Sequence, residues 1–112
     1  MTRPFNNEET CFLCRRRADG LGVGTPNKLG WVCQDCLPLS KDAYAMTDRA
    51  FDTFEQRAIA AAGEQAGGYL DEIGKTDLAQ LDDTEWRLFL NTVVRSFGEA
   101  IRTEVQSGKA PF

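Results

Sequence analysis

The 112-residue sequence contains no histidine, and no apolar run approaches the roughly 18 residues needed to cross a bilayer. The first residues, Met1 to Phe5, lack the apolar segment of a secretory signal. The sequence has no glycine-rich phosphate-binding loop, no nucleophile elbow and no carboxylate motif in apolar surroundings. These absences predict a cytoplasmic protein with no membrane association, and they argue against an enzyme.

Charge is spread unevenly along the chain, whose formal net charge is -4. Residues 1–41 carry six basic and four acidic side chains, whereas residues 42–112 carry seven basic and thirteen acidic ones. Because a phosphate backbone is bound mainly through Lys and Arg, only the N-terminal part is a plausible contact for nucleic acid. The length corresponds to one domain, or to a small module with an appendage.

The four cysteines fall in two pairs with the spacing C-x2-C-x18-C-x2-C. Thiolates two residues apart share one tight turn, and two such turns complete a tetrahedral zinc site. Disulfides are disfavoured in the cytoplasm, cysteines at these spacings are unusual core residues, and a redox C-x-x-C motif would not need a second pair. The sequence therefore predicts one structural Zn²⁺ per chain, held by Cys11, Cys14, Cys33 and Cys36.

Turn-forming residues punctuate the segment between the two cysteine pairs. Residues 21–23 and 29–32 are strand-like and flank Pro26-Asn27, which predicts a β-hairpin. A helical pattern begins just after Cys36. This order of elements is that of a treble-clef zinc finger, in which a cysteine knuckle is followed by a hairpin and by a second knuckle at the start of a helix. The N-terminus of that helix would stabilise the thiolates.

Residues 11–40 resemble the N-terminal zinc-binding domain of the ClpX-type unfoldases. That family shares the cysteine spacing, an aromatic–aliphatic pair before the third cysteine (here Trp31-Val32) and an apolar residue after the fourth (here Leu37). The resemblance implies a treble clef with the four cysteines as ligands, and no ATPase follows it here. Residues 85–112 are similar to the tail of small uncharacterised phage and prophage proteins, which implies a phage origin and a location in the host cytoplasm.

Beyond residue 40 the apolar residues keep helical spacing. The first expected helix runs from Ser40 to about residue 62–65 and is ended by Gly67-Gly68. Single helical turns are expected over 69–73 and 76–81. The second helix is expected over 83–106, begins with a capping box of Asp82 and Glu85, and closes at Ser107-Gly108. Two long helices with apolar stripes most simply pack antiparallel on each other.

These elements predict an α+β, mostly helical fold. A treble-clef finger spans residues 8–40, a helical region spans 41–107 and packs on it as one structural unit, and a tail spans 108–112. Because the helical stripes contain Trp, Phe and Val residues of their own, we expect a Cys33→Ser variant to lose the metal and to keep much of its helical structure.

The apolar stripe of the helix over 83–106 is wider than one partner helix can cover. Val94 and Ile101 lie seven residues apart and so nearly in line along the helix. The stripe serves mainly as core, but this pair is a candidate contact for a protein partner or for a second copy in a homodimer.

Three consecutive arginines follow the first cysteine pair. Arg15, Arg16 and Arg17, with Lys28, are a candidate phosphate-binding patch for nucleic acid. The alternative, which we favour, is that these cations offset the net charge of -2 carried by a zinc ion with four thiolates.

The function predicted from the sequence is that of a non-enzymatic, zinc-binding interaction or adaptor module. It is compatible with a phage-encoded protein that acts on a host protein. The alternative is a nucleic-acid-binding zinc finger that uses the patch at residues 15–17.

Overall fold

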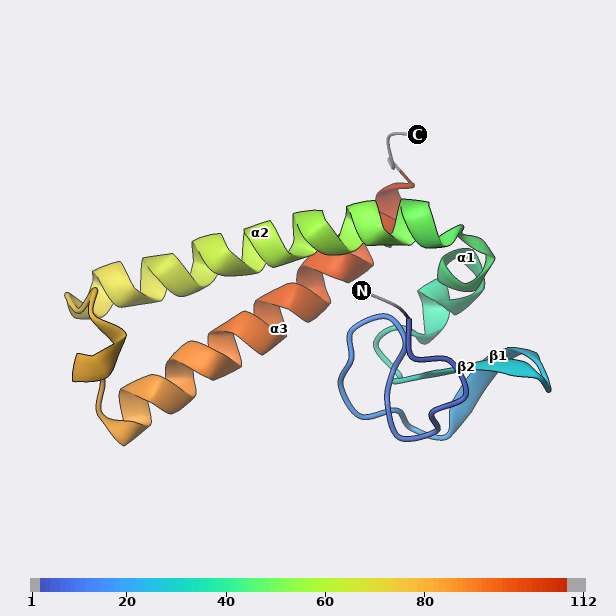
Figure 1. Cartoon of the computed structure of the whole chain (residues 1–112), viewed down its shortest axis with the longest axis horizontal. Coiled ribbons are helices and arrows are strands. Elements are labelled where there is room, and N and C mark those ends of the chain that lie inside the picture. The colour runs from blue at the N-terminus through green and yellow to red at the C-terminus, as the bar shows by residue number, and fades with distance from the viewer. Residues whose placement is uncertain (1–2, 109–112) are drawn as a thin grey trace.

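The computed structural model describes residues 3–108, which form a small finger packed against one end of a helical hairpin (Figure 1). The elements, with η marking a 3-10 helix, are β1 (Leu21–Thr25), β2 (Lys28–Val32), η1 (Leu37–Leu39), α1 (Ser40–Ala45), α2 (Asp48–Ile73), η2 (Leu78–Gln80) and α3 (Asp83–Ser107). This order confirms the predicted α+β, mostly helical fold, with a hairpin followed by two long antiparallel helices. None of the described helices is long and apolar enough to cross a membrane. Most of the predicted tail, residues 109–112, lies outside the described part.

The predicted β-hairpin forms, with β1 and β2 antiparallel and Leu21 opposite Val32. Thr25 pairs with Lys28, so Pro26-Asn27 is a two-residue loop. A Cβ at Gly30 would lie 2.7 Å from the ring of Phe12, so only glycine lets β2 cross this buried ring so closely.

The helix expected from Ser40 is broken into α1 and α2, which corrects the prediction of one continuous helix. Thr47 is the N-cap of α2, with extended backbone and a side chain that accepts a hydrogen bond from the Ala50 N–H. Arg3 holds the break together, since its buried guanidinium donates to the carbonyl oxygens of Ala43 at 2.7 Å and Met46 at 3.0 Å. It also pairs with Asp48 at 2.7 Å.

Gly67-Gly68 does not end α2, contrary to the sequence prediction. The helix continues to Ile73 and absorbs the turn expected over 69–73, because Ala66 is buried and Ile73 is still half-buried. It ends at Gly74, whose φ of 70° is the left-handed conformation of a helix C-cap. The second expected turn is the shorter η2, capped by the Asp77 side chain.

The predicted start of α3 is confirmed. The Asp82 side chain accepts from the Glu85 N–H, and the Glu85 side chain accepts from the Asp82 N–H, which is a complete capping box. The helix closes at Gly108, with a φ of 63°.

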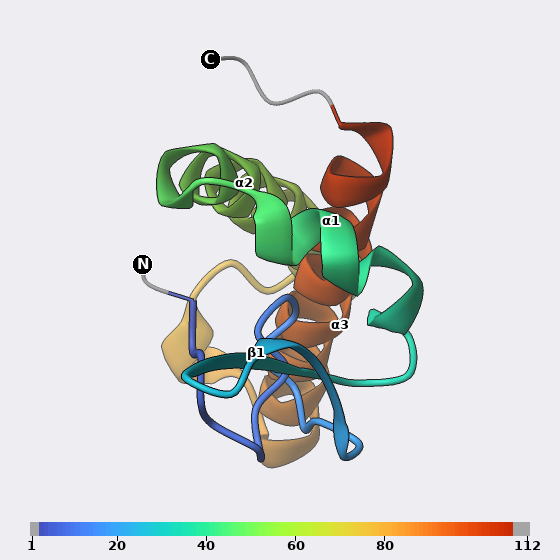
Figure 2. The ribbon, with the colours of Figure 1, turned by 90° about the vertical axis from the view of Figure 1, so that its right-hand side faces the viewer.

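The core lies where the finger meets the two long helices. One buried cluster joins the finger to the helices and contains Cys11, Phe12, Leu13, Cys14, Val32, Cys36, Ala43, Phe51, Phe54, Ala58, Ile101 and Val105. Figure 2 shows this end, with the hairpin in front of α3 and α1 between the hairpin and α2. The other end of α2 and α3 projects beyond the finger. The radius of gyration of 15.4 Å accordingly exceeds the ~13 Å of a compact domain of this length.

Candidate metal centre

The first knuckle is a tight turn closed by backbone hydrogen bonds. The Arg15 N–H donates to the Cys11 carbonyl at 3.0 Å, and the Cys11 N–H donates to the Arg16 carbonyl at 2.7 Å. Arg15 has a φ of 67°, an uncommon left-handed conformation for a non-glycine residue. The Phe12 N–H donates to the Trp31 carbonyl at 2.9 Å, which attaches this knuckle to β2.

The second knuckle follows directly from β2. The Cys36 N–H donates to the Cys33 carbonyl at 3.2 Å, and η1 begins at the next residue. The Asp19 carboxylate accepts from the Gln34 N–H at 2.8 Å, so the segment that leaves the first knuckle holds the second one in place. The helix start after Cys36 is where the sequence predicts it.

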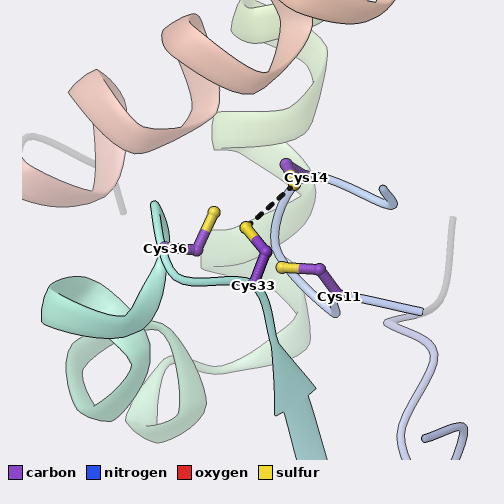
Figure 3. Close-up of side chains that lie close together, drawn as sticks. All are labelled: Cys11, Cys14, Cys33 and Cys36. Carbon is purple, nitrogen blue, oxygen red and sulfur yellow. Dashed lines mark hydrogen bonds between the residues drawn. The ribbon is translucent and has the colours of Figure 1, made fainter. Parts of the chain in front are cut away.

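The two knuckles bring all four sulfur atoms together (Figure 3). The four Sγ atoms lie within 4.8 Å of one another, and those of Cys14 and Cys33 are 3.7 Å apart. Four sulfurs at 2.3 Å from a tetrahedral zinc would be about 3.8 Å apart. The predicted ligand set therefore forms a cluster that is arranged to hold a metal ion, and four thiolates suit a structural zinc.

Burial and mutual hydrogen bonding make the thiols of Cys11, Cys14 and Cys36 unequal. The thiols of Cys14 and Cys36 donate to the Cys11 sulfur and hold the pKa of Cys11 well below its usual range. The same contacts, together with burial, raise the pKa of Cys14 to about 12 and raise that of Cys36 as well. Without a metal, Cys11 therefore loses its proton more readily than Cys14 and Cys36 do. A dication in the centre is what allows all four sulfurs to be thiolates.

Helix α3 supports the cluster from a distant part of the chain. The Arg102 guanidinium donates to the Cys36 sulfur at 3.6 Å, which offsets thiolate charge. One turn earlier, a Cβ at Gly98 would be 3.5 Å from the Cys14 Cβ, so the helix backbone passes close beside the first knuckle. The sequence carried no signal for this role of Arg102, because the contact spans 66 residues.

The structure does not bring the four candidate nucleic-acid contacts together. Lys28 lies at the loop end of the hairpin, with its ammonium 4.6 Å from the centre of the Phe5 ring. Arg15 points to the helices, where its guanidinium pairs with the buried Glu55 of α2 at 2.8 Å. Arg16 and Arg17 are exposed and, with Arg102, line a shallow pocket beside Cys14 and Cys33. The patch of four cations predicted from the sequence is therefore reduced to Arg16 and Arg17.

The sequence does not indicate that Glu55 is buried, because helical spacing alone does not distinguish it from an exposed carboxylate. Its side chain is only 1% exposed. Burial raises the pKa of Glu55, and the charge of Arg15 opposes that rise. The pair ties the first knuckle to α2.

The two candidate interface residues have different environments. Val94 is 48% exposed and lies at the surface, as an interface residue must. Ile101 is fully buried in the cluster with the cysteines, so its prediction as a surface contact is wrong. The finger covers α3 at Ile101 but not at Val94, and helical spacing contains no information about that.

Comparison with known proteins places the helical part of the chain in a family. A family model described as "Family of unknown function (DUF6511)" matches residues 46–112, which include α2 and α3 but none of the four cysteines. No curated protein and no solved structure matches the chain.

Proposed function

We propose that this chain, which belongs to the DUF6511 family of unknown function, is a non-enzymatic zinc protein that acts as a protein-interaction or adaptor module. In this proposal, one structural Zn²⁺ is held by Cys11, Cys14, Cys33 and Cys36 in a treble-clef finger that resembles the ClpX-type zinc-binding domain. The finger fixes the geometry of α2 and α3, and these helices present the surface that contacts a partner.

The donor set supports a structural rather than a catalytic metal. Four cysteine sulfurs complete a tetrahedral shell, whereas a catalytic zinc keeps one position for water or substrate. Within residues 3–108, these cysteines are the one group of three or more Cys, Asp or Glu residues placed to share a metal ion. Reduced thiols suit the cytoplasm, which we propose as the location, and the host cytoplasm if the protein is phage-encoded.

An apolar groove is the observation that carries the interaction role. It has a volume of about 460 Å³ and runs between α2 and α3 up to the first knuckle. Its lining consists of Cys14, Arg15, Arg16, Ile59, Ala62, Gly63, Val93, Val94 and Phe97. Beyond the groove, Trp86 and Leu90 of α3 are also exposed. Contiguous apolar surface of this kind on a small protein is typical of an interaction site.

Zinc affinity is expected to fall by at least about 100-fold for each pH unit below neutral. Zinc displaces the protons of at least Cys14 and Cys36, whose pKa values are raised in the metal-free cluster, and each displaced proton contributes a factor of ten per pH unit. Competition with a chromophoric chelator between pH 6 and pH 8 measures this slope. A slope near zero would show that the thiols are already ionised before zinc binds.

Affinity capture tests the interaction role. Tagged wild-type protein is compared with Val94→Glu, which places a charge at the groove, and with Leu88→Glu, its matched control. Leu88 is equally exposed but lies on the side of α3 away from the groove, because it is nine residues, or two and a half turns, before Phe97 in the groove lining. We expect captured proteins, untagged copies of this chain included, to be lost from the Val94 variant and kept by the Leu88 variant.

Two outcomes of this capture would contradict the proposal. One is equal capture by all three baits. The other is capture that disappears with nuclease treatment and with Arg16→Glu alone, which would favour nucleic-acid binding through the exposed arginines beside the cysteines.

A further inference from the structure

One side of the first half of α3 is apolar and exposed. Trp86 is 45% exposed, Leu90 43% and Val94 48%, and successive members of this set are separated by one helical turn. Val93 and Phe97 continue the same side into the groove beside the knuckle. We call Trp86, Leu90, Val93, Val94 and Phe97 the open face of α3.

The open face exists because the finger covers only half of the helix. The buried residues of α3 are Gly98, Ile101 and Val105, all in its second half, where the finger and α2 pack on it. Figure 1 shows the finger below the end where α2 and α3 meet, and no described segment below the other half of α3. A surface with the same apolar character is thus covered in one half and left open in the other.

The two ends of the molecule differ in charge. The finger end, residues 1–41, has six basic and four acidic side chains, a formal charge of +2 that the -2 of a zinc ion with four thiolates would offset, so its positive charge at the surface is local, at the exposed Arg16 and Arg17. The opposite end, residues 64–85, has seven acidic side chains and one basic one. Asp83 in the first turn of α3 is exposed and lies in line with the open face, because it is eleven residues, or close to three turns, before Val94.

We propose that a second copy of this chain covers the open face, in a two-fold symmetric dimer whose α3 helices pack antiparallel around Val94. This inference rests on the proposed interaction role and names its partner. A two-fold axis at the middle of α3 places the finger of each copy over the half of α3 that the other copy leaves open. Trp86 lies eight residues before Val94, about 12 Å along the helix. Because the two-fold axis passes at Val94, Trp86 of one copy lies at the same level as the residue eight positions after Val94 in the other copy. That residue is Arg102, which lies beside the finger.

Charge favours this antiparallel arrangement over a parallel one. The acidic start of α3 in each copy approaches the finger of the other, so Asp83 lies on the side of the exposed Arg16 and Arg17. A parallel pair would instead place acidic end against acidic end, which is unfavourable across an interface. Closed two-fold pairing also covers both open faces at once, so neither open face is left to recruit a third copy.

Sedimentation equilibrium of the full-length zinc-loaded protein tests the proposal. We expect a mass of about 25 kDa at micromolar concentration, twice the 12.5 kDa of one chain. Val94→Glu places two carboxylates face to face on the axis and is expected to raise the dimer dissociation constant by about 100-fold or more. Leu88→Glu, on the side of α3 opposite Phe97 of the open face, is expected to leave the dimer unchanged.

A charge exchange gives a second readout that does not alter the apolar face. Asp83→Arg and Arg16→Glu are each expected to weaken the dimer, and the double variant is expected to restore it, since the exchanged charges attract again. Circular dichroism measures whether each variant is folded. If Val94→Glu does not fold, the charge exchange between Asp83 and Arg16 tests the dimer in its place.

Three results would overturn the second-copy proposal. They are a monomer at tens of micromolar with zinc bound, a folded Val94→Glu protein that remains dimeric, and species that grow beyond the dimer with concentration. A monomer whose captured proteins are lost with Val94→Glu would overturn the dimer alone and keep the interaction role. If Arg16→Glu abolishes both the dimer and the capture of other proteins, while Val94→Glu and Leu88→Glu abolish neither, the dimer proposal and the proposed interaction role are both overturned.

Discussion

Removal of the metal is expected to unfold the helices as well as the finger, which replaces the expectation from the sequence that much of the helical structure would remain. A structural zinc site contributes roughly 10–16 kcal/mol of apparent binding free energy, which matches or exceeds the whole stability of an ordinary domain. Ile101 and Val105 of α3 share one buried cluster with Cys11, Cys14 and Cys36. Collapse of the finger would therefore expose the same residues that hold α3 against α2.

Far-UV circular dichroism measures this effect. Cys33→Ser, or wild-type protein with a strong chelator, is expected to lose most of its helical signal, and zinc is expected to restore it in the wild type alone. Gln34→Ser is the matched control, because Gln34 is exposed and next to Cys33 but supplies no sulfur. Retention of the helical signal and of a cooperative melt in the metal-free protein would show that α2 and α3 fold on their own.

Arg15→Ala is expected to lower the free energy of unfolding by about 3–5 kcal/mol, since it leaves the buried Glu55 without the guanidinium that pairs with it at 2.8 Å. Arg16→Ala is the matched control. Arg16 is the next residue and is exposed, so its substitution should change stability by no more than about 0.5 kcal/mol. Urea denaturation of the zinc-loaded proteins gives both values.

The Arg15 variant should also show a characteristic pH dependence. Burial raises the pKa of Glu55 in the folded state above its value in the unfolded chain, and loss of Arg15 widens that difference. The folded state then binds more protons than the unfolded state between the two pKa values. Stability of the variant relative to wild type should therefore fall as pH rises through this range and recover as pH decreases. Equal stability of the Arg15 and Arg16 variants at neutral pH would show that the pair contributes little.

Local patterns in the sequence were sufficient to predict much of the fold. The cysteine spacing predicts the sulfur cluster, Pro26-Asn27 predicts the hairpin loop, and Asp82 with Glu85 predicts the start of α3. The hairpin loop and the start of α3 depend on residues that are close in sequence. The sulfur cluster joins distant residues, but the spacing of the cysteines is enough to predict it.

Features that depend on distant contacts were not predictable. The break between α1 and α2 depends on Arg3, which reaches the carbonyls of Ala43 and Met46 some 40 residues away. The burial of Ile101 and the role of Arg102 both follow from where the finger packs on α3. Helical spacing identifies a continuous apolar stripe, but it does not show which half of the stripe the finger covers.

Native mass spectrometry of protein purified under reducing conditions tests the central claim, a structural zinc held by the four cysteines. The predicted result is one zinc ion per chain in the wild-type protein, retained by Gln34→Ser and lost from Cys33→Ser. A wild-type protein with no metal and with two disulfide bonds among Cys11, Cys14, Cys33 and Cys36 would contradict it.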